Sequence, residues 1–234
     1  MNEPTNERTN EGANPLRYNS SMTHPTSPNP QSGRIFLIAI IALAAIAAGL
    51  VVSSMLLDRS QELRAAQAFP QTRPLPDFEL RTAAGETLTP QNLKGQWSLM
   101  FFGFTNCPDI CPDTLAVLDS AIESLDNMGA ASKPQVIFVS VDPGRDDAEA
   151  LGDYVRWFDE SFIGATGSEE QLAALTKNLG IYFALDEPDP DTGFYTVDHS
   201  ASILIIDPQG RLYGRFGPPL DRQAIAADLF ALAR

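Results

Sequence analysis

The stretch Trp97 to Pro112, WSLMFFGFTNCPDICP, decides the fold. Its first part, Trp97 to Phe104, is dense in apolar and aromatic side chains, which is typical of a buried central strand. Two cysteines follow, and Pro112 suits the first turn of a helix because its missing N–H would have no partner there. From Pro112 to Met128, leucine and isoleucine recur at helical spacing. The stretch therefore predicts a strand that leads through the cysteines into a helix.

On both sides of this stretch, strand-like and helix-like segments alternate. The further predicted strands are a hairpin around Ala84-Gly85, then Gln135 to Val141, Phe162 to Ala165, Ala201 to Ile206 and Leu212 to Phe216. The further predicted helices are Asp146 to Phe158, Ser168 to Leu179 and Asp221 to Ala233. The last two strands are expected to form a hairpin that turns at Pro208-Gln209-Gly210. This order predicts one α/β domain over residues 77–234, with a mixed central sheet flanked by helices.

The segments before Asp77 differ in composition from this domain. Residues 1–34 are rich in Asn, Pro, Ser and Thr, which predicts a disordered tail. Ile35 to Leu57 carries no charge and is long enough for a single transmembrane helix. A cleaved signal peptide fits less well, because the apolar run is too long and charged residues separate it from a cleavage site. Residues 58–76 are expected to be a stalk linker, and the arginines on both sides of the apolar run leave its orientation open.

The chain is acidic, with a formal net charge of −14 at pH 7. Glutamates and arginines balance in the tail, so the excess negative charge belongs to the part after the apolar run. A domain of this sign is repelled by phosphate backbones. Nucleic acid is therefore not an expected partner, and the charge serves either solubility or the docking of a basic partner.

Cys107 and Cys111 are the two cysteines of the chain, and both stand at the predicted start of a helix. Unpaired N–H groups and the helix dipole stabilise a thiolate there. The pair has three plausible uses: a structural disulfide, a redox couple, or two ligands of a soft metal. A structural disulfide would close a very short loop and remove little entropy from the unfolded chain. A redox couple is a stronger alternative, although three residues separate the cysteines where two are usual.

A metal site needs at least one more ligand. Of the two histidines, His24 lies in the predicted tail, so His199 is the one available to the domain. A lone histidine is more often an ordinary turn or core residue than a ligand. Two thiolates with one imidazole nevertheless form a set matched to Cu(I), whereas structural zinc would also need Asp109 or Asp198.

Three separated motifs resemble those of the Sco family of copper chaperones. They are Phe101 to Pro112 (FFGFTNCPDICP), Ser140 to Asp146 (SVDPGRD) and Val197 to Ser200 (VDHS). The resemblance covers roughly the whole chain after the apolar run. It implies a thioredoxin-like fold in which Cys107, Cys111 and His199 bind one copper ion, as Cu(I) or Cu(II). One departure is Asn106, where many relatives carry a histidine that is not a family ligand.

The resemblance also implies a role in cytochrome c oxidase assembly, with copper delivered to the copper A centre of subunit II. It implies a domain that faces the periplasm, so with its one predicted span the protein is expected in the bacterial inner membrane. The tail carries three Glu, unlike an acid-poor mitochondrial targeting segment, which agrees with a bacterial source. Another periplasmic copper chaperone or a thiol reductase is a further expected partner. Asp198 is expected to orient His199, and Asp142 to cap the helix that starts around Asp146. The acidic loop Asp186 to Asp191 is hypothesised to become ordered when copper binds.

Two other functions remain open. A thiol-disulfide reductase that keeps the cysteines of the oxidase copper site reduced would need Cys107 and Cys111 but not His199. A peroxidase of related fold typically has a threonine three residues before its attacking cysteine, and Phe104 stands at that position. The reductase is thus the main alternative to the chaperone, and the two activities can coexist in one protein.

Overall fold

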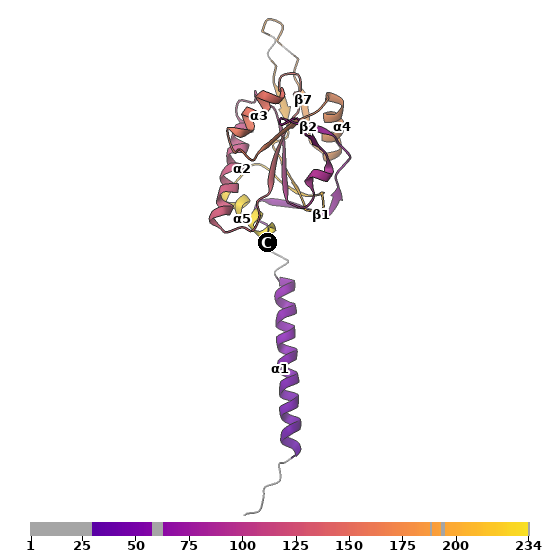
Figure 1. Ribbon diagram of the computed structural model, residues 1–234, viewed down its shortest axis with the longest axis vertical. Coiled ribbons are helices and arrows are strands. Elements are labelled where there is room, and N and C mark those ends of the chain that lie inside the picture. The colour runs from indigo at the N-terminus through magenta and orange to yellow at the C-terminus, as the bar shows by residue number, and fades with distance from the viewer. Residues whose placement is uncertain (1–29, 58–62, 188, 193–194, 234) are drawn as a thin grey trace, which may run out of the picture. The chain divides into compact units, whose positions relative to one another are not determined.

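The computed structural model describes residues 30–57, 63–187, 189–192 and 195–233, in two compact units that divide after Ser60 (Figure 1). The first unit contains helix α1 (Pro30–Leu57), whose side chains are described from Leu37 to Ser53 and are exposed. Among the described residues, we find no helix that combines the length and the apolar character needed to cross a membrane. The predicted disordered tail lies outside the described residues apart from the first turns of α1.

The second unit is built on an eight-stranded sheet with the order β1-β10-β9-β4-β5-β6-β2-β3. The strands are β1 (Ala66–Pro74), β2 (Leu80–Thr82), β3 (Thr87–Leu88), β4 (Ser98–Gly103), β5 (Gln135–Ser140), β6 (Ile163–Thr166), β9 (Ile203–Ile206) and β10 (Arg211–Phe216). The central β4, β5 and β6 are parallel, and all other neighbours in this sheet are antiparallel. The sheet is therefore mixed, as predicted.

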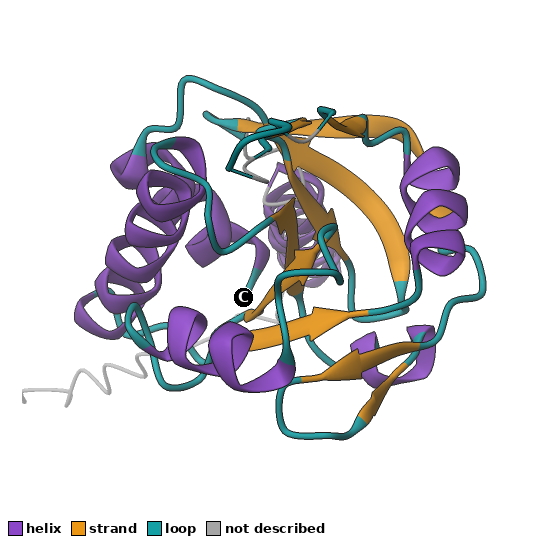
Figure 2. Cartoon of the chain, turned by 90° about the horizontal axis from the view of Figure 1, so that it is seen from above, coloured by secondary structure: helices purple, strands orange, loops and turns teal. Residues whose placement is uncertain are grey.

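Helices cover both faces of this sheet (Figure 2). They are α2 (Ile110–Asn127), α3 (Ala148–Arg156), α4 (Glu169–Leu179) and α5 (Arg222–Leu232), with a short 3₁₀ helix at Pro90–Leu93. Every residue of β4 is buried because its two faces belong to different cores. Met100 and Phe102 pack in the core that includes α4, whereas Leu99 and Phe101 pack in the core that includes α2, α3 and α5. The alternation of strands and helices thus yields the predicted α/β domain.

The sheet begins earlier in the chain than the sequence indicates. Strand β1 lies inside the segment 58–76, for which a stalk was predicted, and it pairs with β10. The carboxylate of Asp228 on α5 accepts hydrogen bonds from the N–H groups of Arg64, Ala65 and Ala66, at 2.7 to 2.8 Å. The prolines of this segment argued against a regular strand. However, β1 is an edge strand, and prolines are tolerated there because one side of the strand has no partner to receive its N–H groups.

A second, two-stranded sheet stands apart from the first. Strands β7 (Phe183–Leu185) and β8 (Val197–His199) pair antiparallel, with Phe183 opposite His199. Neither strand was predicted, because three residues are too few for a periodic pattern. This small sheet matters because β8 ends at the only histidine in the described residues.

Candidate metal centre

The cysteines occupy the connection between β4 and α2, as the sequence predicts. The N–H of Cys107 donates to the carbonyl of Phe104 at 3.2 Å, which folds the connection into a turn. Cys111 lies in the first turn of α2, and its N–H points to Cys107 Sγ at 3.4 Å. Both cysteines are free thiols; Cys111 is fully buried and Cys107 is half-buried. One sulfur therefore belongs to the core and the other to its rim.

Gly103, the last residue of β4, allows Cys111 to approach the sheet. A Cβ atom built on Gly103 would lie 2.5 Å from Cys111 Sγ and 2.8 Å from Cε2 of Phe138. Both separations are far below ordinary van der Waals contact. Only glycine leaves the Cys111 sulfur its observed place against the strand.

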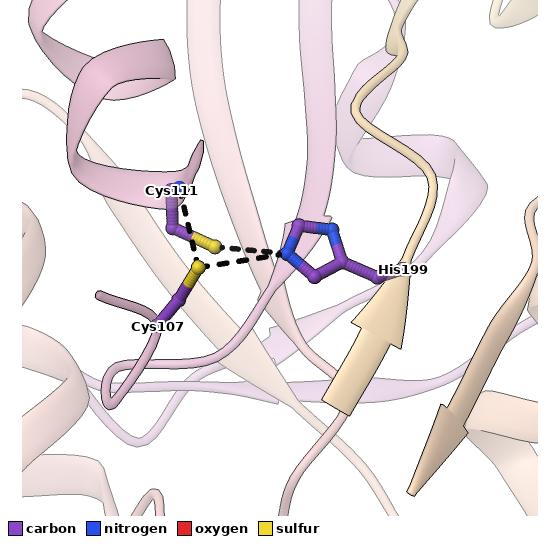
Figure 3. Close-up of side chains that lie close together, drawn as sticks. All are labelled: Cys107, Cys111 and His199. Carbon is purple, nitrogen blue, oxygen red and sulfur yellow. Dashed lines mark hydrogen bonds between the residues drawn. The ribbon is translucent and has the colours of Figure 1, made fainter. Parts of the chain in front are cut away.

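His199 brings the third donor atom from β8. Its Nε2 lies 3.2 Å from Cys111 Sγ and 3.8 Å from Cys107 Sγ, so the imidazole points at both sulfurs (Figure 3). Its other nitrogen, Nδ1, lies 3.4 Å from the carbonyl oxygen of Ser200. The edges of the Phe101 and Phe104 rings meet the imidazole, with ring centroids 5.8 and 6.0 Å apart. The ring is thus held between aromatic neighbours with one nitrogen directed at the thiols.

The three donor atoms all lie within 4.8 Å of one another, and among the described residues no other His, Cys, Asp or Glu joins them in such a group. Burial raises the pKa of the Cys111 thiol, and the negative charge of the nearby Cys107 raises it further. Burial lowers the pKa of His199, although the Ser200 carbonyl and the charge of Asp198 act in the opposite direction. An uncharged imidazole beside two thiols offers soft donors, which is the ligand chemistry of Cu(I) and Zn²⁺.

Of two predicted supporting roles, that of Asp198 stays a prediction and that of Asp142 is wrong. Asp198 is exposed, and its interaction with His199 is one of charge, whereas His199 Nδ1 lies 3.4 Å from the Ser200 carbonyl oxygen. The capping role expected of Asp142 is wrong, because Asp147 caps α3 by accepting from the Ala150 N–H at 2.8 Å. The carboxylate of Asp142 is buried and bonds elsewhere, to Arg145 and Tyr195.

In the turn between β5 and α3, sequence reasoning gave a role to Asp142 alone and none to Arg145 or Asp146. Within it, Asp146 is fully buried and accepts hydrogen bonds from Thr105 and Ser140, so that it ties the cysteine connection to β5. The available signal for these residues was the Sco-like motif SVDPGRD, which contains Asp142, Arg145 and Asp146. Their partners lie up to 53 residues away in the chain, and no local pattern points to them.

The chain is similar to known proteins in sequence and in fold. The human mitochondrial SCO1 homologue is 30% identical over 209 residues, covering 88% of this chain and 68% of that protein. The solved structure of Bradyrhizobium japonicum ScoI with copper bound has a TM-score of 0.61 at 31% identity, covering 68% of this chain and 99% of that one. BsSco, described as a member of the Sco family of cytochrome c oxidase assembly proteins with a disulfide switch, has a TM-score of 0.56, covering 71% of this chain and 98% of its own. At 20% identity, BsSco shows a shared fold alone.

The SCO1/SenC family profile matches residues 67–234, which begin at the second residue of β1 and include both cysteines and His199. The match confirms the resemblance seen in the sequence motifs and the thioredoxin-like α/β fold that it implied. This chain belongs to the SCO1/SenC family.

Proposed function

We propose that this protein is a copper metallochaperone in which Cys107, Cys111 and His199 hold one copper ion. The observation that carries the proposal is the convergence of two sulfurs and one imidazole nitrogen within 4.8 Å, from two segments 88 residues apart. Copper-bound Sco proteins of the same fold support it.

The donor set favours copper over zinc. Structural zinc sites are closed by four ligands, and the described group contains three. Asp198, which was considered as a fourth ligand, is exposed and stands outside the group. Three soft donors with a rim open to solvent suit Cu(I), which accepts low coordination numbers and can pass to another protein by exchange of ligands one at a time.

The client that we propose is cytochrome c oxidase, and within it the copper A centre of subunit II. The support is membership of the SCO1/SenC family, together with the three sequence motifs that resemble those of Sco copper chaperones. Another periplasmic copper chaperone would supply the copper, and a thiol reductase would supply the electrons that keep Cys107 and Cys111 reduced. The client is tested in a strain from which the gene is deleted and in the same strain carrying a restored copy. If the copper content of subunit II is the same in both, the proposed client is refuted.

We also propose that Ile35 to Leu57 anchors the protein in the bacterial inner membrane, with the domain in the periplasm. The support is the sequence, in which residues 35–57 carry no charge and are as many as a bilayer requires. The described side chains of α1, residues 37–53, cover part of this run, and Leu37, Leu43 and Leu50 among them are exposed. Alkaline extraction of membranes tests the anchor, since an integral protein stays in the pellet. Protease added to spheroplasts tests on which side of the membrane the domain lies, because a periplasmic domain is digested without lysis.

The test of the metal site is an anaerobic titration of the reduced full-length chain in detergent with Cu(I), against a competing chelator. The variants are Cys107→Ser, Cys111→Ser and His199→Ala, with His24→Ala as the matched control for loss of a histidine. One tightly bound copper, weakened in the first three variants and unchanged in the control, is the expected result. A wild-type chain that binds no copper would refute the chaperone proposal.

The second candidate function is thiol-disulfide reduction. The specific observation in its favour is that both thiols are free at the start of α2, with the Cys111 N–H directed at Cys107 Sγ. A donor to sulfur stabilises the thiolate, which is the reactive form in disulfide exchange. His199→Ala separates the two functions, because it should weaken copper binding and leave the exchange of the thiol pair with a small disulfide intact.

A further inference from the structure

The turn between β5 and α3, residues 142–146, contacts both halves of the metal centre. On the cysteine side, the buried carboxylate of Asp146 accepts a hydrogen bond from the Thr105 N–H at 2.9 Å and others from the hydroxyls of Thr105 and Ser140. Thr105 stands two residues before Cys107. The turn therefore fixes the start of the cysteine connection.

On the histidine side, the same turn holds Tyr195. The hydroxyl of Tyr195 donates to Asp142 Oδ1 at 2.7 Å, and its carbonyl accepts from the Arg145 guanidinium at 2.9 Å. Arg145 also lies over the Tyr195 ring, with Cζ 3.6 Å from the ring centroid, and it donates to Asp142. We call this group of three side chains the Tyr195 clamp. It contains the Asp142 carboxylate, which is 1% exposed, so the two hydrogen bonds that this carboxylate accepts from Tyr195 and Arg145 are weakly screened by water.

The Tyr195 clamp lies just before the strand that carries His199. At its far end, β8 is held by main-chain contacts: the Ser200 N–H donates to the Tyr182 carbonyl at 2.9 Å. At its near end, the Asp186 N–H donates to the Thr196 carbonyl at 3.0 Å, next to the clamp. Phe104 lies near both sides: Arg145 lies over its ring, with Cζ 5.6 Å from the ring centroid, and the His199 ring stands nearly perpendicular to it, with the centroids 6.0 Å apart. The Tyr195 clamp thus stands at one end of the three-residue strand β8, which also pairs with β7.

We propose that Tyr195 is a positioning residue that holds β8 where His199 reaches both sulfurs, and that it thereby sets how slowly copper leaves the centre. The part about copper rests on the proposed function. Because one turn holds both the cysteine connection and the histidine strand, it fixes the positions of the cysteines and of His199 relative to each other. Loosening the Tyr195 side moves the imidazole alone and leaves the thiols in place.

The test compares Tyr195→Phe with Tyr182→Phe in the full-length chain. Tyr195→Phe removes one hydroxyl donor to Asp142 and keeps the ring, whereas Tyr182 is a largely exposed tyrosine at the other end of the same hairpin. The first measurement is amide hydrogen exchange of Asp186 in the metal-free protein, and the second is the rate at which Cu(I) passes to a chelator in excess. Both rates should rise about tenfold in Tyr195→Phe, the size expected for a lost hydrogen bond to a carboxylate, and stay unchanged in Tyr182→Phe.

A third measurement separates positioning from general damage. The reaction of the two thiols with a small disulfide should be the same in Tyr195→Phe as in the wild type, because Asp146 still holds the cysteine connection. Arg145→Lys, which keeps the charge and loses the planar stack on Tyr195, should act in the same direction and replaces Tyr195→Phe if that variant does not fold.

The outcomes of the proposal and of the proposed function are distinguishable. Wild-type rates of exchange and of copper release in both Tyr195→Phe and Arg145→Lys would overturn the positioning role while leaving the copper site intact. A wild-type chain that retains no copper would overturn the proposed function, and the exchange of Asp186 would then decide by itself whether Tyr195 holds β8.

Discussion

The substitution Gly103→Ala tests the close approach of Cys111 to the sheet. The new methyl carbon would meet Cys111 Sγ at 2.5 Å and Phe138 Cε2 at 2.8 Å. Since such atoms normally stay about 3.5 Å apart or more, the sulfur or the ring has to move by about 1 Å. Overpacking of this kind in a close-packed core costs about 1–3 kcal/mol. We expect the free energy of unfolding of the apo protein to fall by that amount.

The same displacement should weaken metal binding. In the wild-type structure Cys111 Sγ lies 3.2 Å from His199 Nε2, and the new methyl group would push the sulfur away from this position. Denaturant unfolding of the metal-free chain measures the first effect, and Cu(I) competition measures the second. Gly217→Ala is the matched control, since the nearest atom to its new carbon would be Gln67 Nε2 at 3.8 Å, an ordinary contact. Wild-type stability together with wild-type copper affinity in Gly103→Ala would refute the reasoning.

Three other perturbations have defined outcomes. Asp228→Ala leaves the N–H groups at the start of β1 without their acceptor and should cost about 1–3 kcal/mol in denaturant unfolding, whereas a loss below 0.5 kcal/mol would mean that β1 does not depend on this carboxylate. Ser168→Ala removes the hydroxyl that accepts from the Gln171 N–H and should cost about 1 kcal/mol by the same assay, with the exposed Ser161→Ala as its control. Burial raises the pKa of Cys111 above its ordinary value of 9.0, so the folded state holds this proton more tightly than the unfolded state. The resulting stability is present below pH 9 and lost as the pH rises further, and unfolding curves of the reduced apo protein should show a loss above pH 9 that is smaller in Cys111→Ser.

The sequence predicted the elements whose side chains repeat over several turns or along a buried strand. Strand β4 has a continuous apolar run because both of its faces are covered, and α2 repeats leucine at helical spacing, so both were found with nearly their observed bounds. The capping box of α4 is a local signal, and Ser168 and Gln171 form it as expected. Local chemistry is enough for such features because all of the interacting residues lie within one turn.

The features that were missed depend on contacts between distant segments. Strand β1 looked like a stalk because prolines interrupt it, and only its place at the edge of the sheet makes them acceptable. For the site, composition and spacing named the three donor residues, since the domain offers so few cysteines and histidines. The contacts of Asp142 could not be predicted in the same way, because two helices and two strands separate it from its partner Tyr195 in the chain.

The three donor residues differ in exposure, and that difference bears on transfer of the metal. Cys111 is fully buried beneath the site and fixed by the first turn of α2, whereas Cys107 and His199 are half-buried at its rim. If these residues hold copper as proposed, an acceptor protein would approach the metal from the side of Cys107 and His199, while Cys111 would stay bound on the buried side. Because ligand exchange proceeds one donor at a time, release would begin with the rim ligands and end with the buried thiolate. On this reasoning the strand that carries His199 controls the first step, and the core that surrounds Cys111 controls the last.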